Sequence, residues 1–143
     1  MTNSKDIFNT REVAEDLASR LPCRIFALIG DLGAGKTTFS QFFLRALKVK
    51  GRITSPTFTI IKNYKLNSPI GGQNYASAYH IDCYRIKNPE ELLALGFKEI
   101  LDNPKNILLI EWADKIKELL PKSALWIEFE HGKDKNERNI IID

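Results

Sequence analysis

Hydrophobic and polar positions alternate along the chain in short blocks, and these blocks predict helices and strands in turn. Apolar residues recur every three or four positions between residues 10 and 21, which predicts a helix over residues 10–21 that starts at Asn9. Residues 23–29 form an apolar run bounded by proline and glycine, as is typical of a buried parallel strand. The glycine-rich loop that follows opens a second helix, which we expect to end near Leu47.

Two pairs of β-rich segments predict antiparallel strands. Residues 57–64 and 75–82 are rich in β-branched and aromatic residues, and the turn residues between them favour direct pairing. Residues 125–130 and 139–142 surround a polar turn and predict a terminal hairpin. Both pairs therefore add antiparallel strands to the fold.

The segments between these pairs alternate between helix and strand. Residues 89–95 predict a short helix that starts with proline and ends at Gly96, and residues 107–110 predict a second apolar strand. Residues 113–120 predict another helix, which stops at Pro121. This mixed order predicts an α/β fold with a partly parallel sheet.

The length and composition favour one globular domain over residues 1–143. With 43% hydrophobic and 27% charged residues, the chain has the composition of a folded protein, and it holds no apolar run near the roughly 20 residues that cross a bilayer. The N-terminal residues lack a basic start followed by an apolar stretch, so we expect a cytoplasmic protein with no membrane among its partners. Cys23 and Cys83 lie in apolar segments, where we expect reduced thiols rather than a disulfide or a metal pair.

The distribution of charge is uneven, although the net charge is only +3. Residues 32–81 contain no acidic residue, and their basic residues are Lys36, Arg45, Lys48, Lys50, Arg52, Lys62 and Lys65. Such a stretch favours a polyanion nearby, with nucleotide phosphate as the first candidate and RNA as the second. A solvated basic surface explains the residues beyond Lys36 equally well, so both interpretations stay open.

The loop after the first predicted strand carries the strongest chemical signal. Its sequence, Gly30-Asp31-Leu32-Gly33-Ala34-Gly35-Lys36-Thr37, matches the pattern G-x-x-x-x-G-K-[ST] between a strand and a helix. The glycines let successive backbone N–H groups face phosphate oxygens, and the start of the helix adds its positive end. We expect Lys36 to reach the β- and γ-phosphates and the Thr37 hydroxyl to bind Mg²⁺. The predicted fold is therefore a P-loop NTPase-type mixed sheet flanked by helices, with antiparallel hairpins.

The phosphate loop alone leaves the nucleotide and the reaction open. The sequence contains no Asn-Lys-x-Asp element, which is usual in guanine-specific switches, so ATP is favoured over GTP. A nucleotide or small-molecule kinase needs an acceptor pocket and usually a lid, for which this chain has little spare length. A kinase and a nucleotide-dependent binding switch remain the alternatives to an ATPase.

Two acidic residues at the ends of predicted strands are candidates for holding the metal and orienting the attacking water. Asp82 closes one strand and Glu111 follows the other. Each acid is either a ligand at the carboxyl edge of a parallel sheet or a helix cap. By side-chain length we assign Asp82 to Mg²⁺ and Glu111 to catalysis, with a metal contact by Glu111 as a further option.

Further residues are candidates for binding. The hydroxyl-rich segment around Thr57 either senses the γ-phosphate or forms an edge-strand turn. Trp112, beside the second acid, either stacks in the site or covers the core. Thr10 and Arg138 are candidates for contacts with the base or the ribose of the nucleotide. We interpret His80 as a strand residue rather than as a base.

Five motifs in order carry a resemblance to a known family. They are Gly30-Asp31-Leu32-Gly33-Ala34-Gly35-Lys36-Thr37-Thr38, Ser55-Pro56-Thr57-Phe58-Thr59, His80-Ile81-Asp82-Cys83-Tyr84-Arg85, Asn88-Pro89-Glu90-Glu91-Leu92 and Ile110-Glu111-Trp112. In this combination the chain resembles the TsaE (YjeE) family over nearly its whole length. It departs from the family pattern in having Ala113-Asp114 in place of a proline-acid pair and a longer loop over residues 67–77, which could alter a contact with a partner.

The resemblance implies a bacterial ATPase of tRNA threonylcarbamoyladenosine biosynthesis, which binds ATP with Mg²⁺ and hydrolyses it slowly. Its implied partners are the TsaD and TsaB proteins, and tRNA is a partner only indirectly, through the complex that modifies the adenosine beside the anticodon. The family pattern places Mg²⁺ on Thr37 with help from Asp82 and Glu111, and it implies a functional Trp112. We expect Glu111 and Lys36 to carry the catalysis. Nucleotide phosphates are implied on Gly33, Ala34, Gly35, Lys36, Thr37 and Thr38.

Overall fold

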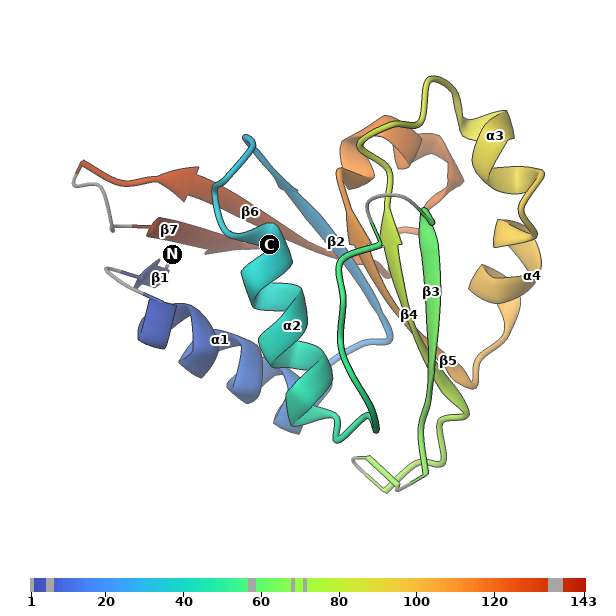
Figure 1. Cartoon of the computed structure of the whole chain (residues 1–143), viewed down its shortest axis with the longest axis horizontal. Helices are drawn as coiled ribbons and strands as arrows, with labels where there is room; N and C mark the ends of the chain where they lie inside the picture. The colour runs from blue at the N-terminus through green and yellow to red at the C-terminus, as the bar shows by residue number, and fades with distance from the viewer. Residues whose placement is uncertain (1, 5–6, 57–58, 68, 71, 134–137) are drawn as a thin grey trace.

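A mixed β-sheet runs through the computed structural model, which describes residues 2–4, 7–56, 59–67, 69–70, 72–133 and 138–143 (Figure 1). The seven strands of these ranges lie in the order β1-β7-β6-β2-β5-β4-β3. β6, β2, β5 and β4 run parallel to one another, whereas β7 pairs antiparallel with β6, β1 with β7 and β3 with β4. The strands are β1 (Thr2–Ser4), β2 (Ile25–Gly30), β3 (Ile61–Lys65), β4 (Ser77–Asp82), β5 (Asn106–Glu111), β6 (Leu125–His131) and β7 (Arg138–Ile142). The predicted α/β class, with a mixed sheet and antiparallel hairpins, is confirmed.

Helices cover both faces of the sheet. On one face lie α1 (Ile7–Arg20) and α2 (Lys36–Ala46), and on the other lie α3 (Pro89–Leu93), α4 (Phe97–Asp102) and the 3₁₀ helix η1 (Ala113–Leu119) (Figure 1). Two clusters of buried side chains fill the spaces between these helices and the sheet. Each face therefore has its own core, as is usual when the parallel strands of a sheet are covered on both sides.

Aromatic side chains hold α2 over the centre of the sheet. The ring centroids of Phe26 in β2 and Phe43 in α2 are 4.8 Å apart, and those of Phe39 in α2 and Phe129 in β6 are 5.4 Å apart. All four side chains are buried, so they remove a large apolar area from water and stabilise this packing. The start of α2 is thereby held close to the carboxyl ends of β2 and β6.

Two elements begin three or more residues away from the predicted start, and a third is a different type of helix. α1 begins at Ile7, so Asn9 lies inside the helix and does not start it. β3 begins only after Ile60, whose left-handed backbone with a φ angle of 65° interrupts the extended run. The first two residues of that predicted strand, 57–58, lie outside the described residues. The predicted helix over residues 113–120 is a 3₁₀ helix, and Ile116 interrupts it with non-helical angles.

Two elements of the structure have no counterpart in the sequence analysis. β1 has only three residues and pairs with β7, the last strand of the chain, so no local pattern marks it. Gly96, expected to end a helix, also begins α4 with a φ angle of 88°. Within the described ranges, no stretch of helix combines the length and the hydropathy that crossing a bilayer requires.

Candidate functional site

The glycine loop, residues 30–37, joins the end of β2 to the start of α2. Gly30 has a φ angle of 143°, and a Cβ atom there would lie 2.3 Å from the carbonyl oxygen of Phe129 in β6. No side chain fits against that backbone, so glycine is required at this position. Gly33 and Gly35 also have left-handed φ angles, of 77° and 112°. The loop thus follows a path that residues with side chains rarely adopt.

The side chain of Lys36 folds back over this loop. Its Nζ donates hydrogen bonds to the carbonyl oxygens of Gly30, at 2.5 Å, and Asp31, at 2.9 Å, and lies 4.2 Å from the centre of the Trp112 ring. Burial lowers the pKa of Lys36, and nearby carboxylates, first among them Glu111, oppose this shift. The charge of Lys36 is therefore held between the loop, an aromatic face and the acidic ends of the strands.

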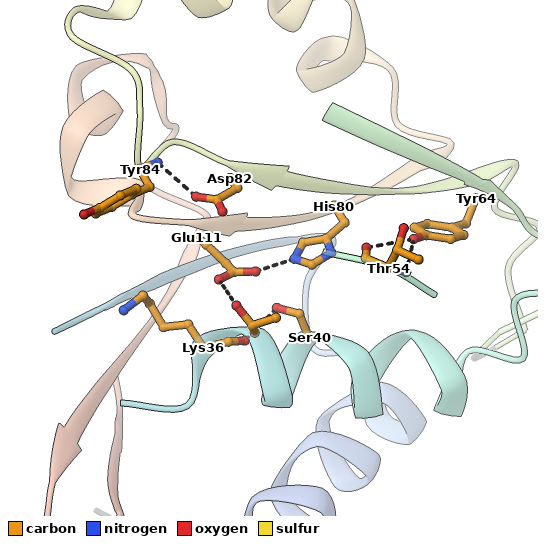
Figure 2. Close-up of polar contacts among 9 residues, drawn as sticks. Lys36, Ser40, Thr54, Tyr64, His80, Asp82, Tyr84 and Glu111 are labelled. Atoms are coloured by element: carbon orange, nitrogen blue, oxygen red, sulfur yellow. Dashed lines mark hydrogen bonds and ion pairs between the residues drawn. The ribbon is translucent and has the colours of Figure 1, made fainter. Parts of the chain in front are cut away.

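Glu111 links the glycine loop to the sheet. It is the last residue of β5 and is only 2% exposed. The hydroxyl of Thr37 donates a hydrogen bond of 2.7 Å to its Oε1. Nε2 of His80 lies 2.5 Å from its Oε2 (Figure 2). Each carboxylate oxygen thus has a hydrogen-bond partner. The partner of Oε1 is the Thr37 hydroxyl, which we expect from the sequence to bind Mg²⁺.

Asp82 lies beside Glu111 on the neighbouring strand. The two residues are register partners at the carboxyl ends of β4 and β5, so their side chains point to the same side of the sheet. Asp82 is 7% exposed, and its Oδ1 accepts a hydrogen bond of 2.9 Å from the backbone N–H of Tyr84 (Figure 2). The structure therefore brings both predicted acids to one edge of the sheet, next to the start of α2.

Trp112 lies between the core and Lys36, and its part in the function stays a prediction. It follows Glu111 in a left-handed conformation with a φ angle of 58°. Its half-buried ring packs against the core under η1, lies 5.1 Å from the ring of Tyr84 and faces the ammonium of Lys36. One side of Trp112 therefore covers the core, and the other side lines the site.

The segment that leads to Thr57 is anchored on β3. Nζ of Lys62 donates a hydrogen bond to Oγ1 of Thr54. The hydroxyl of Tyr64 is hydrogen-bonded to the backbone of the same threonine (Figure 2). Lys62 is the register partner of His80, so this segment lies over the side of the sheet that carries His80. Thr57 itself lies outside the described residues, and its role stays a prediction.

The other predicted nucleotide contacts occupy three places. Four residues belong to the glycine loop or to the first turn of α2, namely Gly33, Ala34, Gly35 and Thr38. Thr10 is 3% exposed within α1, so it has little surface with which to contact a ligand. Arg138 begins β7 as the register partner of His131, whose Nε2 lies 3.3 Å from the carbonyl oxygen of Leu32 in the loop. The roles of these residues stay predictions.

The basic segment divides between the site and the surface. Lys36 is buried at the glycine loop and Lys62 is half-buried on β3, whereas Lys48, Lys50 and Arg52 are exposed. Arg45 and Lys65 are also exposed, so five of the seven cations of the segment face solvent, and Lys36 is the buried cation at the glycine loop.

His80 is the site residue whose contact the sequence analysis missed. It lies in β4, as predicted, but its ring is fully buried and contacts Glu111. One signal was present in the sequence, because His80 and Asp82 are two residues apart in a strand and so share a face. The contact itself depends on β5 lying beside β4, which no local pattern indicates.

Together, the fold and the site define an α/β protein with a glycine-loop site at the carboxyl edge of its parallel strands, where ligands of open α/β sheets bind. A family model described as "Threonylcarbamoyl adenosine biosynthesis protein TsaE" matches residues 4–140. The chain belongs to this TsaE family, which gives it a role in tRNA threonylcarbamoyladenosine biosynthesis.

Individual relatives and a solved structure agree with this assignment. The tRNA threonylcarbamoyladenosine biosynthesis protein TsaE of Rickettsia conorii is 39% identical over 131 residues, which cover 90% of this chain and 69% of the relative. The protein of the same name from Bacillus subtilis is 39% identical over 121 residues, which cover 85% of this chain and 70% of the relative. The crystal structure of YdiB from Bacillus subtilis is similar over 97% of this chain and 80% of that chain, with a TM-score of 0.74 and 33% identity. The resemblance inferred from the five motifs is confirmed.

Proposed function

We propose that this chain is an ATP-binding and ATP-hydrolysing accessory subunit of the machinery that makes threonylcarbamoyladenosine in tRNA. The observation that carries the proposal is the hydrogen bond from Thr37 to Glu111, because it joins the glycine loop to a carboxylate at the end of a strand. Phosphate-loop ATPases hold Mg²⁺ against nucleotide phosphates with such a pair of a loop hydroxyl and a strand-end acid. Membership of the TsaE family supports the pathway.

The donors at this site suit Mg²⁺. The hydroxyl of Thr37 and the carboxylates of Glu111 and Asp82 are hard oxygen donors, which Mg²⁺ prefers. The described residues contain no group of three or more His, Cys, Asp or Glu side chains that could hold a metal ion by themselves. Thr37 and Glu111 would therefore hold Mg²⁺ together with nucleotide oxygens and water. Bound there, the ion would neutralise negative charge on the phosphates.

The remaining parts of the site fit ATP hydrolysis. Lys36 is close enough to the loop to exchange its carbonyl partners for β- and γ-phosphate oxygens. Glu111 holds the Thr37 hydroxyl and is placed to orient a water molecule, and Asp82 adds a second negative charge at the same edge. The half-buried ring of Trp112 limits the access of solvent to Lys36.

We infer that the protein partners are TsaD and TsaB, in the cytoplasm, and that tRNA meets this chain only through their complex. The motifs of the TsaE family support this inference.

The test measures phosphate release from ATP by the purified chain, with and without Mg²⁺ and with no acceptor present. We expect slow release over many turnovers that requires Mg²⁺ and is lost in Thr37→Ala. Release that requires an added acceptor would favour a kinase, and tight ATP binding without turnover would favour a binding switch. Pull-down of TsaD and TsaB, with and without ATP, tests the partners.

A further inference from the structure

A buried histidine contacts the carboxylate at the centre of the proposed site. His80 is fully buried in β4, Glu111 is 2% exposed, and Nε2 of the ring lies 2.5 Å from Oε2 of the carboxylate. This contact is within hydrogen-bond distance, and a carboxylate oxygen is the acceptor. Because both side chains are buried, solvent cannot replace this bond when it is lost.

His80 reaches Glu111 diagonally across two parallel strands. Its register partner is Leu109, two residues before Glu111, so the three side chains point to the face that α2 covers. Leu109 belongs to the buried cluster under α2. Packing therefore fixes the ring from the side of the core, while its Nε2 faces the site (Figure 2).

The two ring nitrogens of His80 have different surroundings. Nδ1 is buried and has no hydrogen-bond partner among the residues that the structure describes. Nε2 faces Oε2 of Glu111. A carboxylate oxygen accepts, so this bond requires a hydrogen on Nε2, which donates it to Glu111.

We propose that His80 is a positioning residue that fixes the orientation of the Glu111 carboxylate, and this role rests on the ATPase function proposed above. With Oε2 held by His80, Oε1 is turned toward the Thr37 hydroxyl. Without that donor, the carboxylate can rotate about its last bond and no longer presents a fixed oxygen beside Thr37. His80 thus acts on metal binding and hydrolysis through Glu111.

The test compares two variants with a control. His80→Leu removes the donor at similar volume, whereas the amide of His80→Gln can donate from about the same place. We expect His80→Leu to raise the Mg²⁺ concentration for half-maximal single-turnover ATP hydrolysis, and to lower the maximal rate, by about tenfold or more each. ATP affinity without Mg²⁺ stays close to that of the wild type, and His80→Gln recovers most of both losses. Tyr79→Leu, on the opposite side of the same strand, is the control and leaves the Mg²⁺ response unchanged.

Two results would overturn the proposal. One is a wild-type Mg²⁺ response in His80→Leu, and the other is a defect in His80→Gln as large as that in His80→Leu. If the wild-type chain does not hydrolyse ATP at all, the proposed ATPase function fails by itself. In that case, we measure how binding of a non-hydrolysable ATP analogue depends on Mg²⁺. The largest defect is again expected in His80→Leu, a smaller one in His80→Gln and none in Tyr79→Leu.

A measurement on the wild-type chain does not depend on the folding of any variant. NMR of ¹⁵N-labelled histidine should place a hydrogen on Nε2 of His80, and the signal should shift in Glu111→Gln. A hydrogen on Nδ1 alone would overturn the proposal, because Nε2 could then not donate to Glu111.

Discussion

Asp82 and Glu111 are register partners at the ends of two parallel strands, and their carboxylates accept hydrogen bonds from different groups. Glu111 accepts one from the Thr37 hydroxyl, and Asp82 accepts one from the backbone N–H of Tyr84. Side-chain length alone assigned Mg²⁺ to Asp82. In the structure, Glu111 is the acid that contacts Thr37, the residue whose hydroxyl we expect to bind Mg²⁺. We therefore expect Glu111 to contribute to both metal binding and catalysis.

We expect Glu111→Gln to impair the chain more than Asp82→Asn does. Each amide keeps an oxygen of similar shape but loses the negative charge, and the charge beside Thr37 matters both for the metal and for the transition state. Glu111→Gln should lower single-turnover ATP hydrolysis by about 100-fold or more and raise the Mg²⁺ requirement. Rapid-quench measurements over a range of Mg²⁺ concentrations test this. Glu118→Gln, on the exposed side of η1, is the control, and a larger loss in Asp82→Asn would give Asp82 the main role.

Lys36→Ala should abolish tight ATP binding. The ammonium is the positive charge at the glycine loop, and its removal should cost at least about 2 kcal/mol of binding free energy, or roughly a 30-fold loss of affinity. Isothermal titration calorimetry measures the effect directly. Lys122→Ala, at an exposed position, should bind ATP as the wild type does, and an unchanged affinity in Lys36→Ala would contradict the assignment of the phosphate loop.

ATP affinity should also fall as the pH rises, and the fall should begin below the range of an ordinary lysine. Burial lowers the pKa of Lys36 from its usual value of 10.5, so the ammonium loses its proton and its charge at a lower pH than an exposed lysine does. Binding measured between neutral and alkaline pH tests this dependence. Lys36→Arg, which stays charged over this range, should remove it, and the same pH profile in both proteins would assign the fall to another group.

Gly30→Ala should destabilise the fold far more than Gly51→Ala does. Both glycines have left-handed φ angles, but only the Cβ atom at Gly30 would meet backbone, at 2.3 Å from the carbonyl oxygen of Phe129. We expect a loss of about 1 kcal/mol for Gly51→Ala from backbone strain and of about 3 kcal/mol or more for Gly30→Ala. Denaturant unfolding of the two variants measures the difference. Equal losses would mean that β6 moves away from the loop at little cost.

The exposed part of the basic segment should contribute to association. Replacing Lys48, Lys50 and Arg52 together by Gln should weaken binding to the TsaD and TsaB proteins or to their tRNA, more strongly at low salt than at high salt, while basal ATP hydrolysis survives. Binding measured at two salt concentrations checks this. The same replacement of Lys87, Lys98 and Lys122, exposed elsewhere, is the control. Equal binding by all three proteins at both salt concentrations would favour a solvated surface.

Local patterns predicted the glycine loop, α2 and the apolar strands well, because glycine positions and apolar runs determine such elements over a few neighbouring residues. The same patterns correctly predicted that Glu111 and Asp82 lie at the ends of strands. They did not reveal the contact between His80 and Glu111, which are 31 residues apart and meet only because β4 and β5 are neighbours. The start of α1 was misplaced because a polar residue such as Asn9 fits the first turn of a helix as well as its cap.

Lys36 has a consequence for affinity that follows from its place over the loop. The ammonium already has two oxygen ligands, the carbonyl groups of Gly30 and Asp31. An ammonium has three N–H donors, so a phosphate oxygen can bind the third, but a second phosphate oxygen must displace one of the carbonyl groups. Part of that new interaction then replaces an old one. In the proposed ATPase, the loop would thus compete with the nucleotide for Lys36, and nucleotide affinity would report the difference between two sets of ligands for a single cation.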